Sequence, residues 1–264
     1  MTSSILIDLQ LLLLAAGLTA PRAVVMLAIV PGFGANTFSP TLRSAVAFAI
    51  TLPAMLPTFY ALRGIHGGTI LLLMLGMKEA LIGLVLGVLL SIPMWALQSV
   101  GSILDMQRSP IQIQSGNASI DRDASAVGAM LVQAMMIVMI QAGLLAGLVR
   151  ILLDSYAAWP VASLAPPFEP GHGAMLLARF GELLWHIVVY GAPLILTLLL
   201  IDFGMAVVGA FAPNLQVSFV SSPIKSLTGL LVLLVYWPTL SHYVAGDFAR
   251  TLDVIPALLQ AGGP

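Results

Sequence analysis

The residues of this chain that could do chemistry are charged side chains inside long apolar stretches. Lys78 and Glu79 are adjacent in one such stretch, and Arg22 and Asp202 are isolated in two others. Charges at membrane depth are costly, so each is by default a functional residue in an ion pathway, a proton relay or a contact. Adjacent helical residues point about 100° apart, so Lys78 and Glu79 need not pair with each other and each can reach another helix.

Each of these charges also has a structural interpretation. Lys78 and Glu79 suit a segment end equally well, where the lysine stem reaches the interface. For Arg22 and Asp202 we favour an ion pair or a helix cap over a proton relay.

The sequence contains no pattern typical of a catalytic, metal or nucleotide site. There are no cysteines, and the four histidines are scattered without a His-x-x-x-His spacing. A Gly-x-Ser-x-Gly elbow, a His-Glu-x-x-His motif and a phosphate-binding Gly-Lys-Ser/Thr loop are also missing. We therefore expect a protein that is not an enzyme and that needs no cofactor or metal.

The elements that position the charges are apolar runs long enough to cross a bilayer. Hydrophobic residues make up 59% of the chain and charged residues only 8%. About 20 apolar helical residues span a hydrocarbon core of about 30 Å. Since the apolar residues do not alternate, an α-helical membrane protein fits better than a β-barrel. The net charge of −1 argues against a nucleic-acid partner. The charge-free runs are 44–62, 80–104, 124–149, 183–201, 203–224 and 226–246.

We predict an all-α, polytopic membrane protein with one domain over residues 1–264 and about six partly broken hydrophobic segments. Pro53 and Pro57 should kink the second segment or split it into two short helices. Three glycine pairs with a spacing of four residues predict close approach of another helix: Gly64/Gly68, Gly83/Gly87 and Gly143/Gly147. The segments are 5–30, 40–62, 69–99, 126–153, 174–201 and 226–245.

Two stretches interrupt this pattern. Gly101–Ser125 is the longest polar segment of the chain and lies between two strongly apolar ones. Asp202–Lys225 is apolar but punctuated by glycine, proline and asparagine, and we expect a packed, partly re-entrant element there.

Three stretches together resemble the export-apparatus family of bacterial type III secretion systems that includes flagellar FliR and the virulence-system T-type proteins (SctT, HrcT, YscT). The first comprises Arg22, Pro31-Gly32-Phe33-Gly34, Pro40 and Arg43. The second comprises Lys78-Glu79, Gly83, Gly87, Gly101 and Leu104-Asp105-Met106-Gln107. The third comprises Ala212-Pro213-Asn214-Leu215-Gln216-Val217-Ser218-Phe219 and Pro223-Ile224-Lys225-Ser226. The chain departs from the family pattern at Ala210, where many relatives have arginine, and at the amides Asn214 and Gln216.

The resemblance implies a subunit of an export gate in the bacterial inner membrane. In the family, one T-type chain joins five R-type and four S-type chains in a cone of bent helical hairpins. Unfolded substrates pass through its channel, a switch protein of the U type (FlhB) adjoins it, and a T-type loop plugs the closed pore.

Within this resemblance, Gly101–Ser125 is the best candidate for the plug, whereas the residues alone favour an ordinary aqueous loop. The predicted plug or gate residues are Ile103, Leu104, Asp105, Met106, Gln107, Arg108, Ile111 and Ile113. The predicted contacts to other subunits are Arg22, Lys78, Glu79, Pro213, Asn214, Gln216 and Lys225.

Two other functions remain open at this point. A secondary transporter for a small solute would use the interruptions at Pro31-Gly32 and Pro213-Asn214 as broken helices, with Glu79 and Asp202 as coupling acids. The third possibility is a structural subunit without a moving gate.

Overall fold

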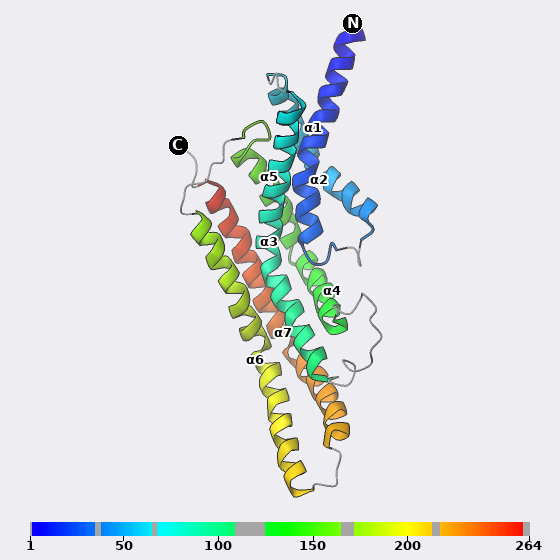
Figure 1. Cartoon of the computed structure of the whole chain (residues 1–264), viewed down its shortest axis with the longest axis vertical. Helices are drawn as coiled ribbons and strands as arrows, with labels where there is room; N and C mark the ends of the chain where they lie inside the picture. Colours follow the sequence, from blue (N-terminus) through cyan, green and yellow to red (C-terminus); the bar gives the residue numbers. More distant parts are fainter. Residues whose placement is uncertain are drawn as a thin grey trace. The chain divides into compact units, whose positions relative to one another are not determined.

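A computed structural model describes residues 2–34, 38–64, 68–108, 125–164, 172–212 and 217–260. Regular structure within these ranges is entirely helical, as Figure 1 shows. The helices are α1 (Thr2–Ile29), α2 (Pro40–Leu62), α3 (Thr69–Arg108), α4 (Ala126–Gln141), α5 (Leu144–Ala158), α6 (His172–Phe211) and α7 (Val217–Gln260).

The helices have the length and composition of membrane spans. Among the described residues, five helices are long and apolar enough to cross a bilayer, and there are six spans if α4 and α5 form one broken span. Helices satisfy their own backbone hydrogen bonds, which hydrocarbon cannot do for them. The predicted polytopic α-helical membrane fold is confirmed.

The second hydrophobic segment forms one helix, so the predicted possibility of a split at Pro53 or Pro57 is wrong. Ser39 caps its start, because the backbone N–H of Leu42 donates to the Ser39 hydroxyl at 3.3 Å. Pro40 follows in the first turn, where the lack of an N–H costs nothing.

The fourth hydrophobic segment, which was predicted to be continuous, forms two helices instead of one. The chain breaks at residues 142–143, and Gly143 has a φ of 71°. That left-handed conformation favours glycine, because other residues meet a steric penalty from Cβ. The composition of this segment is apolar throughout, so periodicity did not reveal the break.

Three helices are longer than the sequence predicted. Helix α3 continues through Gly101 to Arg108, so the first third of the predicted polar segment is helical. Similarly, 202–211 belongs to α6 and 217–225 to α7. The predicted re-entrant element therefore consists, over its described residues, of the end of one helix and the start of the next.

The chain divides into two compact units. Unit 1 comprises 1–92, 139–179 and 248–264, and unit 2 comprises 93–138 and 180–247. Helices α3, α4, α6 and α7 contribute residues to both units. The prediction of a single membrane domain stays a prediction.

In unit 1, glycines allow α3 to lie against α1 backbone to backbone. A Cβ on Gly83 would lie 2.2 Å from the carbonyl oxygen of Arg22, and one on Gly87 would lie 3.0 Å from that of Met26. Real Cβ atoms do not occur at the first distance, so Gly83 cannot be replaced without moving a helix. The packing role predicted for this glycine pair is confirmed. It is wrong for Gly64/Gly68 and Gly143/Gly147 as pairs, because a Cβ on Gly68 or Gly143 would meet no atom within 4 Å.

In unit 2, a second glycine pair serves the same purpose. A Cβ on Gly101 of α3 would lie 2.4 Å from the Cα of Gly128 in α4. Three residues further along α3, Leu104 is 1% exposed, and its Cδ1 occupies the space beside Gly229 of α7. The end of α3 is therefore part of the packed interior of unit 2.

Candidate functional site

The centre of unit 1 is a buried ion pair between α1 and α3. The Arg22 guanidinium donates to both carboxylate oxygens of Glu79, from Nε at 2.7 Å and from Nη2 at 3.0 Å. Both side chains are 0% exposed. This two-point geometry matches the planar fork of arginine to a carboxylate, and lysine could not reproduce it.

Glycine spacing explains how the pair forms. Gly83 follows Glu79 by one helical turn, so both lie on the same face of α3. Because Gly83 has no side chain, the backbone of α1 approaches α3 at Arg22 itself. The Arg22 side chain is thus positioned by the same close contact that excludes solvent from the pair.

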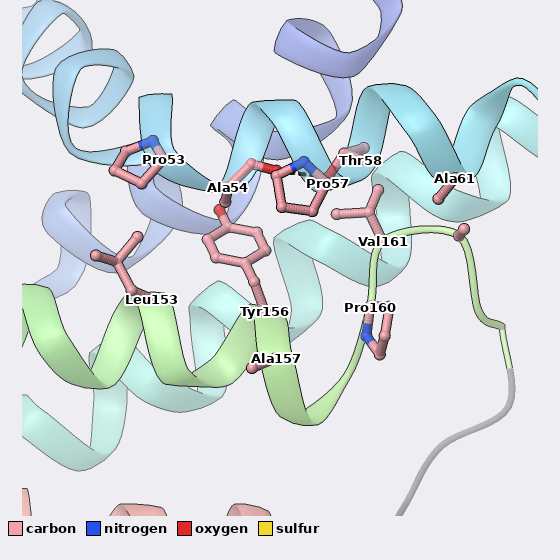
Figure 2. Close-up of a pocket in the computed structure, with 11 residues that line it drawn as sticks. Pro53, Ala54, Pro57, Thr58, Ala61, Leu153, Tyr156, Ala157, Pro160 and Val161 are labelled. Atoms are coloured by element: carbon pink, nitrogen blue, oxygen red, sulfur yellow. Dashed lines mark hydrogen bonds between the residues drawn. The ribbon is translucent and has the colours of Figure 1, made fainter.

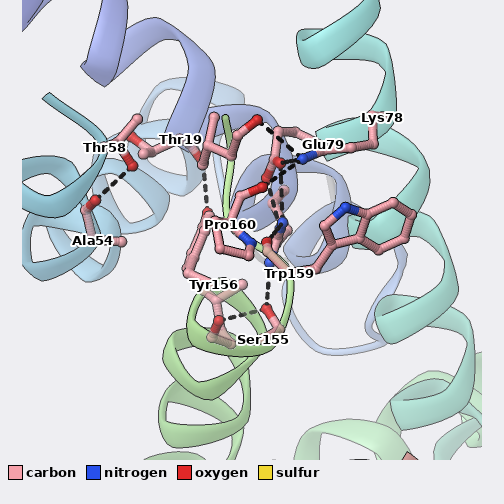
Figure 3. A network of polar contacts seen from close by, with 12 residues as sticks. Thr19, Ala54, Thr58, Lys78, Glu79, Ser155, Tyr156, Trp159 and Pro160 are labelled. Carbon is pink, nitrogen blue, oxygen red and sulfur yellow. Dashed lines mark hydrogen bonds and ion pairs between the residues drawn. The ribbon is translucent and has the colours of Figure 1, made fainter. Parts of the chain in front are cut away.

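Arg22 also donates hydrogen bonds to residues around the end of α5. Nη1 donates to the Ser155 hydroxyl at 2.9 Å, and Nη2 also donates to the Trp159 carbonyl at 3.0 Å. The Arg22 guanidinium lies 4.2 Å from the ring centre of Tyr156, whose hydroxyl donates to the Thr19 carbonyl at 2.6 Å. Figure 3 shows Thr19 of α1, Glu79 of α3 and Tyr156 of α5 close to one another in this network.

Lys78 fixes the chain that follows α5. Its ammonium donates to the carbonyls of Pro160 at 2.9 Å, Val161 at 3.1 Å and Ser163 at 2.8 Å, and pairs with Glu79 at 2.8 Å. Carbonyls beyond a helix end lack intrahelical partners, and unpaired polar groups are expensive in apolar surroundings. The Lys78 ammonium therefore provides hydrogen-bond donors for three carbonyl oxygens of the irregular backbone after α5.

Through these contacts the charged cluster holds α1, α3 and the end of α5 together within the chain. The Glu79 carboxylate is held by two cations, and Arg22, Lys78 and Glu79 are at most 8% exposed. The predicted contacts of the three residues with other subunits stay a prediction, since their side chains are used internally here. Sequence reasoning missed Ser155, a single hydroxyl without a distinctive pattern around it. It also missed the carbonyl acceptors, because backbone groups leave no signal in residue types.

Next to this cluster lies an apolar groove between α2 and the end of α5, with a volume of about 390 Å³. Figure 2 shows Tyr156 at its centre, so one side chain separates the groove from the ion cluster. The hydroxyls beside it are satisfied internally, since Thr58 donates to the Ala54 carbonyl at 2.8 Å. The groove is lined by Pro53, Ala54, Pro57, Thr58, Ala61, Leu153, Tyr156, Ala157, Pro160, Val161 and Ala162.

In unit 2, Asp105 holds the start of α4. Its Oδ2 accepts from the Ser125 hydroxyl at 2.6 Å and from the Val127 N–H at 3.0 Å. The Ser125 oxygen in turn accepts from the Gly128 N–H at 2.8 Å, which is a helix N-cap. A carboxylate near a helix N-terminus is also favoured by the helix dipole.

The other predicted plug residues differ in how far the structure buries them. Leu104 is buried, Ile103 and Gln107 are half-buried, and Met106 is 69% exposed. They share the last turns of α3 and do not lie on one surface. The side chain of Arg108, and the whole of Ile111 and Ile113, lie outside the described residues.

Of the remaining predicted contact residues, the structure describes Lys225 of α7. Lys225 forms an ion pair with Asp202, which supports the structural interpretation of that acid. The lysine side chain is 12% exposed and the aspartate side chain 47% exposed. Pro213, Asn214 and Gln216 lie outside the described residues.

No group of three potential metal ligands from histidine, aspartate and glutamate occurs in the ranges that the structure describes. The contacts described above position helices: the buried charges join α1, α3 and the end of α5, and the Asp105 carboxylate holds the start of α4.

Comparison with known proteins gives these positions a family context. Residues 13–251 match the family model "Bacterial export proteins, family 1". The chain is 32% identical over 189 residues to the Yop proteins translocation protein T of Yersinia pestis, covering 72% of each chain. It is 28% identical over 206 residues to the secretion system apparatus protein SsaT of Salmonella typhimurium, covering 77% of this chain and 79% of the relative.

A flagellar relative is matched over nearly its whole length. The flagellar biosynthetic protein FliR of Caulobacter vibrioides is 24% identical over 248 residues, which is 90% of this chain and 94% of the relative. Together with a family match that includes the buried charges and the Asp105 contact, these similarities confirm the resemblance seen in the sequence. The chain belongs to family 1 of the bacterial export proteins, the group that contains the T-type type III secretion proteins and FliR.

Proposed function

We propose that this chain is a subunit of the export gate of a type III secretion system in the bacterial inner membrane. The observation that carries the proposal is the family match over residues 13–251, with relatives named for secretion and flagellar biosynthesis. In this proposal it assembles with R-type and S-type partners, as one copy with five and four copies. A U-type switch protein adjoins the gate, unfolded substrates pass through it, and the chain itself catalyses no reaction.

We further propose that the segment after α3 plugs the closed pore. Support comes from its two anchors, because Asp105 before the segment binds Ser125 and Val127 after it. The contact between Gly101 and Gly128 brings the same two helices together one turn further back. Such anchors would hold the two ends of a plug at a fixed place.

The geometry weighs against the alternative of a solute transporter. A coupling acid must bind and release a cation, but Glu79 is fully buried and held by Arg22 and Lys78. Asp202, the other acid considered, is paired with Lys225. Neither acid is among the residues that line the apolar groove, and those residues carry no charge.

Native mass spectrometry of the detergent-extracted complex tests the assembly. The chain is co-expressed with its candidate R-type and S-type partners, and a mixed complex with a single copy of this chain is expected. A chain that remains alone, or pairs only with itself, would contradict the proposal. Solute-flux assays on Glu79→Gln and Asp202→Asn would then test the transporter.

A deletion tests the plug separately. Removing residues 109–121 leaves both anchors, Asp105 and Ser125, in place. We expect an ion leak through the assembled gate, measured as a loss of membrane potential, while the complex still forms. A Gly-Ser segment of the original length is the matched control for connector length. If neither variant leaks, the segment is inert structure and the plug proposal fails.

A further inference from the structure

Arg43, one turn into α2, is a cation for which the described part of the chain supplies no counter-charge. The other lysine and arginine side chains that the structure describes each have an ion pair, a hydrogen bond or an electrostatic contact. Arg43 is half-buried, and its Nε is enclosed without a hydrogen-bond partner. Buried polar groups in proteins nearly always have a partner, and a charge in a membrane span is costly. An acceptor from outside the chain would therefore complete this side chain.

The position of Arg43 along α2 matches one face of a bilayer. At the other end of the helix, Arg63 lies among exposed polar groups, since it pairs with the exposed Asp8 at 2.7 Å. The charge-free run 44–62 separates the two arginines, which are about 30 Å apart along the helix axis. That separation equals the thickness of the hydrocarbon core. When Arg63 lies at one interface, Arg43 therefore lies at the level of the headgroups on the other.

The surface of α2 between the arginines suits lipid. Phe48, Leu52 and Leu56 follow one another at intervals of four residues, so they lie on one face of the helix, and all three are exposed. Thr41 and Ser44, in contrast, are exposed residues with hydroxyl groups in the first two turns. The change from exposed hydroxyls to exposed apolar side chains is expected where a helix passes from the headgroups into hydrocarbon.

Arg43 lies on the packed face of α2, opposite these exposed apolar residues. It shares that face with Ala47 and Ala54, which are buried. Helical side chains lean toward the start of their helix, which for Arg43 is the direction out of the hydrocarbon. The nitrogens agree with this direction, because Nε is enclosed whereas Nη1 and Nη2, at the tip, are not enclosed in this way. An external ligand therefore meets the tip of the guanidinium.

We propose that Nη1 and Nη2 of Arg43 bind the headgroup phosphate of an anionic phospholipid. Two parallel N–H donors of a guanidinium fit two oxygens of one phosphate. An anionic lipid also supplies the negative charge that Arg43 lacks, and it does so at the level of the interface. A carboxylate of a neighbouring protein has the same charge, but the spacing of about 30 Å along α2 favours the headgroup. This inference depends on the membrane fold and not on the export-gate proposal.

Native mass spectrometry of the full chain in detergent, titrated with lipid, tests the site. Dioleoylphosphatidylglycerol should bind the unmodified chain about fivefold more tightly than dioleoylphosphatidylcholine, which has the same acyl chains but no net charge. Arg43→Gln should lose this preference. Arg63→Gln is the matched control, because it removes the same charge from the end of α2 where Asp8 already binds the guanidinium. Added inorganic phosphate should leave the preference unchanged, since it has no acyl chains.

An equal preference in Arg43→Gln and in the unmodified chain, or none in either, would overturn the proposal. Displacement of the lipid by inorganic phosphate would also overturn it, because the site would then bind free anions. Retained lipid preference in Arg43→Gln, together with lost assembly when partner proteins are co-expressed, would assign the cation to a protein carboxylate instead.

A second measurement covers the case in which Arg43→Gln does not fold. Phosphatidylglycerol with a photoreactive headgroup is crosslinked to the unmodified chain, and the adducts are located by peptide mass spectrometry. They should map to the first two turns of α2, and adducts confined to other segments would contradict the assignment. Lipid titration and crosslinking use the chain alone, so their outcome is independent of the export-gate proposal.

Discussion

Units 1 and 2 differ in how much of their charged and apolar side chains is buried. Unit 1 buries Arg22 and Glu79 completely, whereas the Asp202–Lys225 pair of unit 2 has an aspartate that is 47% exposed. In their most apolar windows, α3, which contributes to both units, is 67% buried, α1 and α2 of unit 1 are 39% and 28% buried, and α6 and α7 are each 11% buried. The α1–α3–α5 contacts are thus completed within the chain, while α6 and α7 leave apolar surface for lipid or for other subunits.

This comparison separates what holds the chain together from what it offers to its surroundings. Apolar side chains such as Leu199, Phe203, Leu231 and Leu234 are more than 60% exposed on α6 and α7. Exposed apolar area of this kind marks a membrane or protein contact. Mutations in unit 1 should therefore impair folding, and mutations on α6 and α7 should impair assembly first.

The largest effect is expected from breaking the buried ion pair. Arg22→Met leaves Glu79 buried beside a single cation and should cost about 3–5 kcal/mol of unfolding free energy. Denaturant unfolding in detergent measures the loss. The double variant Arg22→Met, Glu79→Met should recover part of it, because no uncompensated carboxylate remains. Equal stability of Arg22→Met and the unmodified protein would show that the pair does not lock unit 1.

The next effect concerns the close contact of α1 and α3. Gly83→Ala places a methyl group 2.2 Å from the Arg22 carbonyl oxygen, so the helices must separate. We expect a loss of about 1–3 kcal/mol in the same unfolding assay. Gly76→Ala on the same helix is the control, since its Cβ would meet only Leu18 at 3.8 Å. Equal losses in the two variants would mean that glycine is needed for another reason.

A smaller effect is expected in unit 2 at the anchor of α4. Asp105→Ala removes the acceptor of the Val127 N–H and should cost about 0.5–2 kcal/mol, as losing a helix cap does. Hydrogen exchange should become faster at the first turn of α4 and stay unchanged in α1. Met106→Ala, at the exposed neighbouring position, should leave exchange unaltered. Protection that persists in Asp105→Ala would exclude the aspartate as the anchor.

The smallest effect is expected from an exposed pair in unit 1. Arg63 and Asp8 are bonded at 2.7 Å, but their side chains are 47% and 53% exposed. Solvent screens such pairs, so Arg63→Gln should cost no more than about 0.2–1 kcal/mol. Comparing the loss of unfolding free energy in this variant with that in Arg22→Met shows whether an ion pair stabilises unit 1 through its charge alone or because it is buried. A loss as large as that of Arg22→Met would contradict the role assigned to burial.

The sequence predicted the helical membrane fold and the family because both depend on residue types in order. Long charge-free runs identify spans, and motifs such as Lys78-Glu79 identify the family. The break at Gly143 was not predictable, since one left-handed glycine among 24 glycines has no distinct pattern. The acceptors of Lys78 are carbonyls of Pro160, Val161 and Ser163, and backbone acceptors are the same in every residue. Which acid pairs with which cation depends on packing that only the structure supplies.

The three carbonyls bound by Lys78 have a consequence for how the chain is made. They are synthesised about eighty residues after the lysine, at the point where the chain leaves α5. Until α3 stands beside them, the Pro160 and Ser163 oxygens have only local donors, the Ser163 N–H and the Trp159 indole N–H, and the turn would be costly in hydrocarbon. Helices α1 and α3, already joined by Arg22 and Glu79, therefore form a receptor for the nascent segment. The order of synthesis from the ribosome thus matches the order in which unit 1 can be completed in the bilayer.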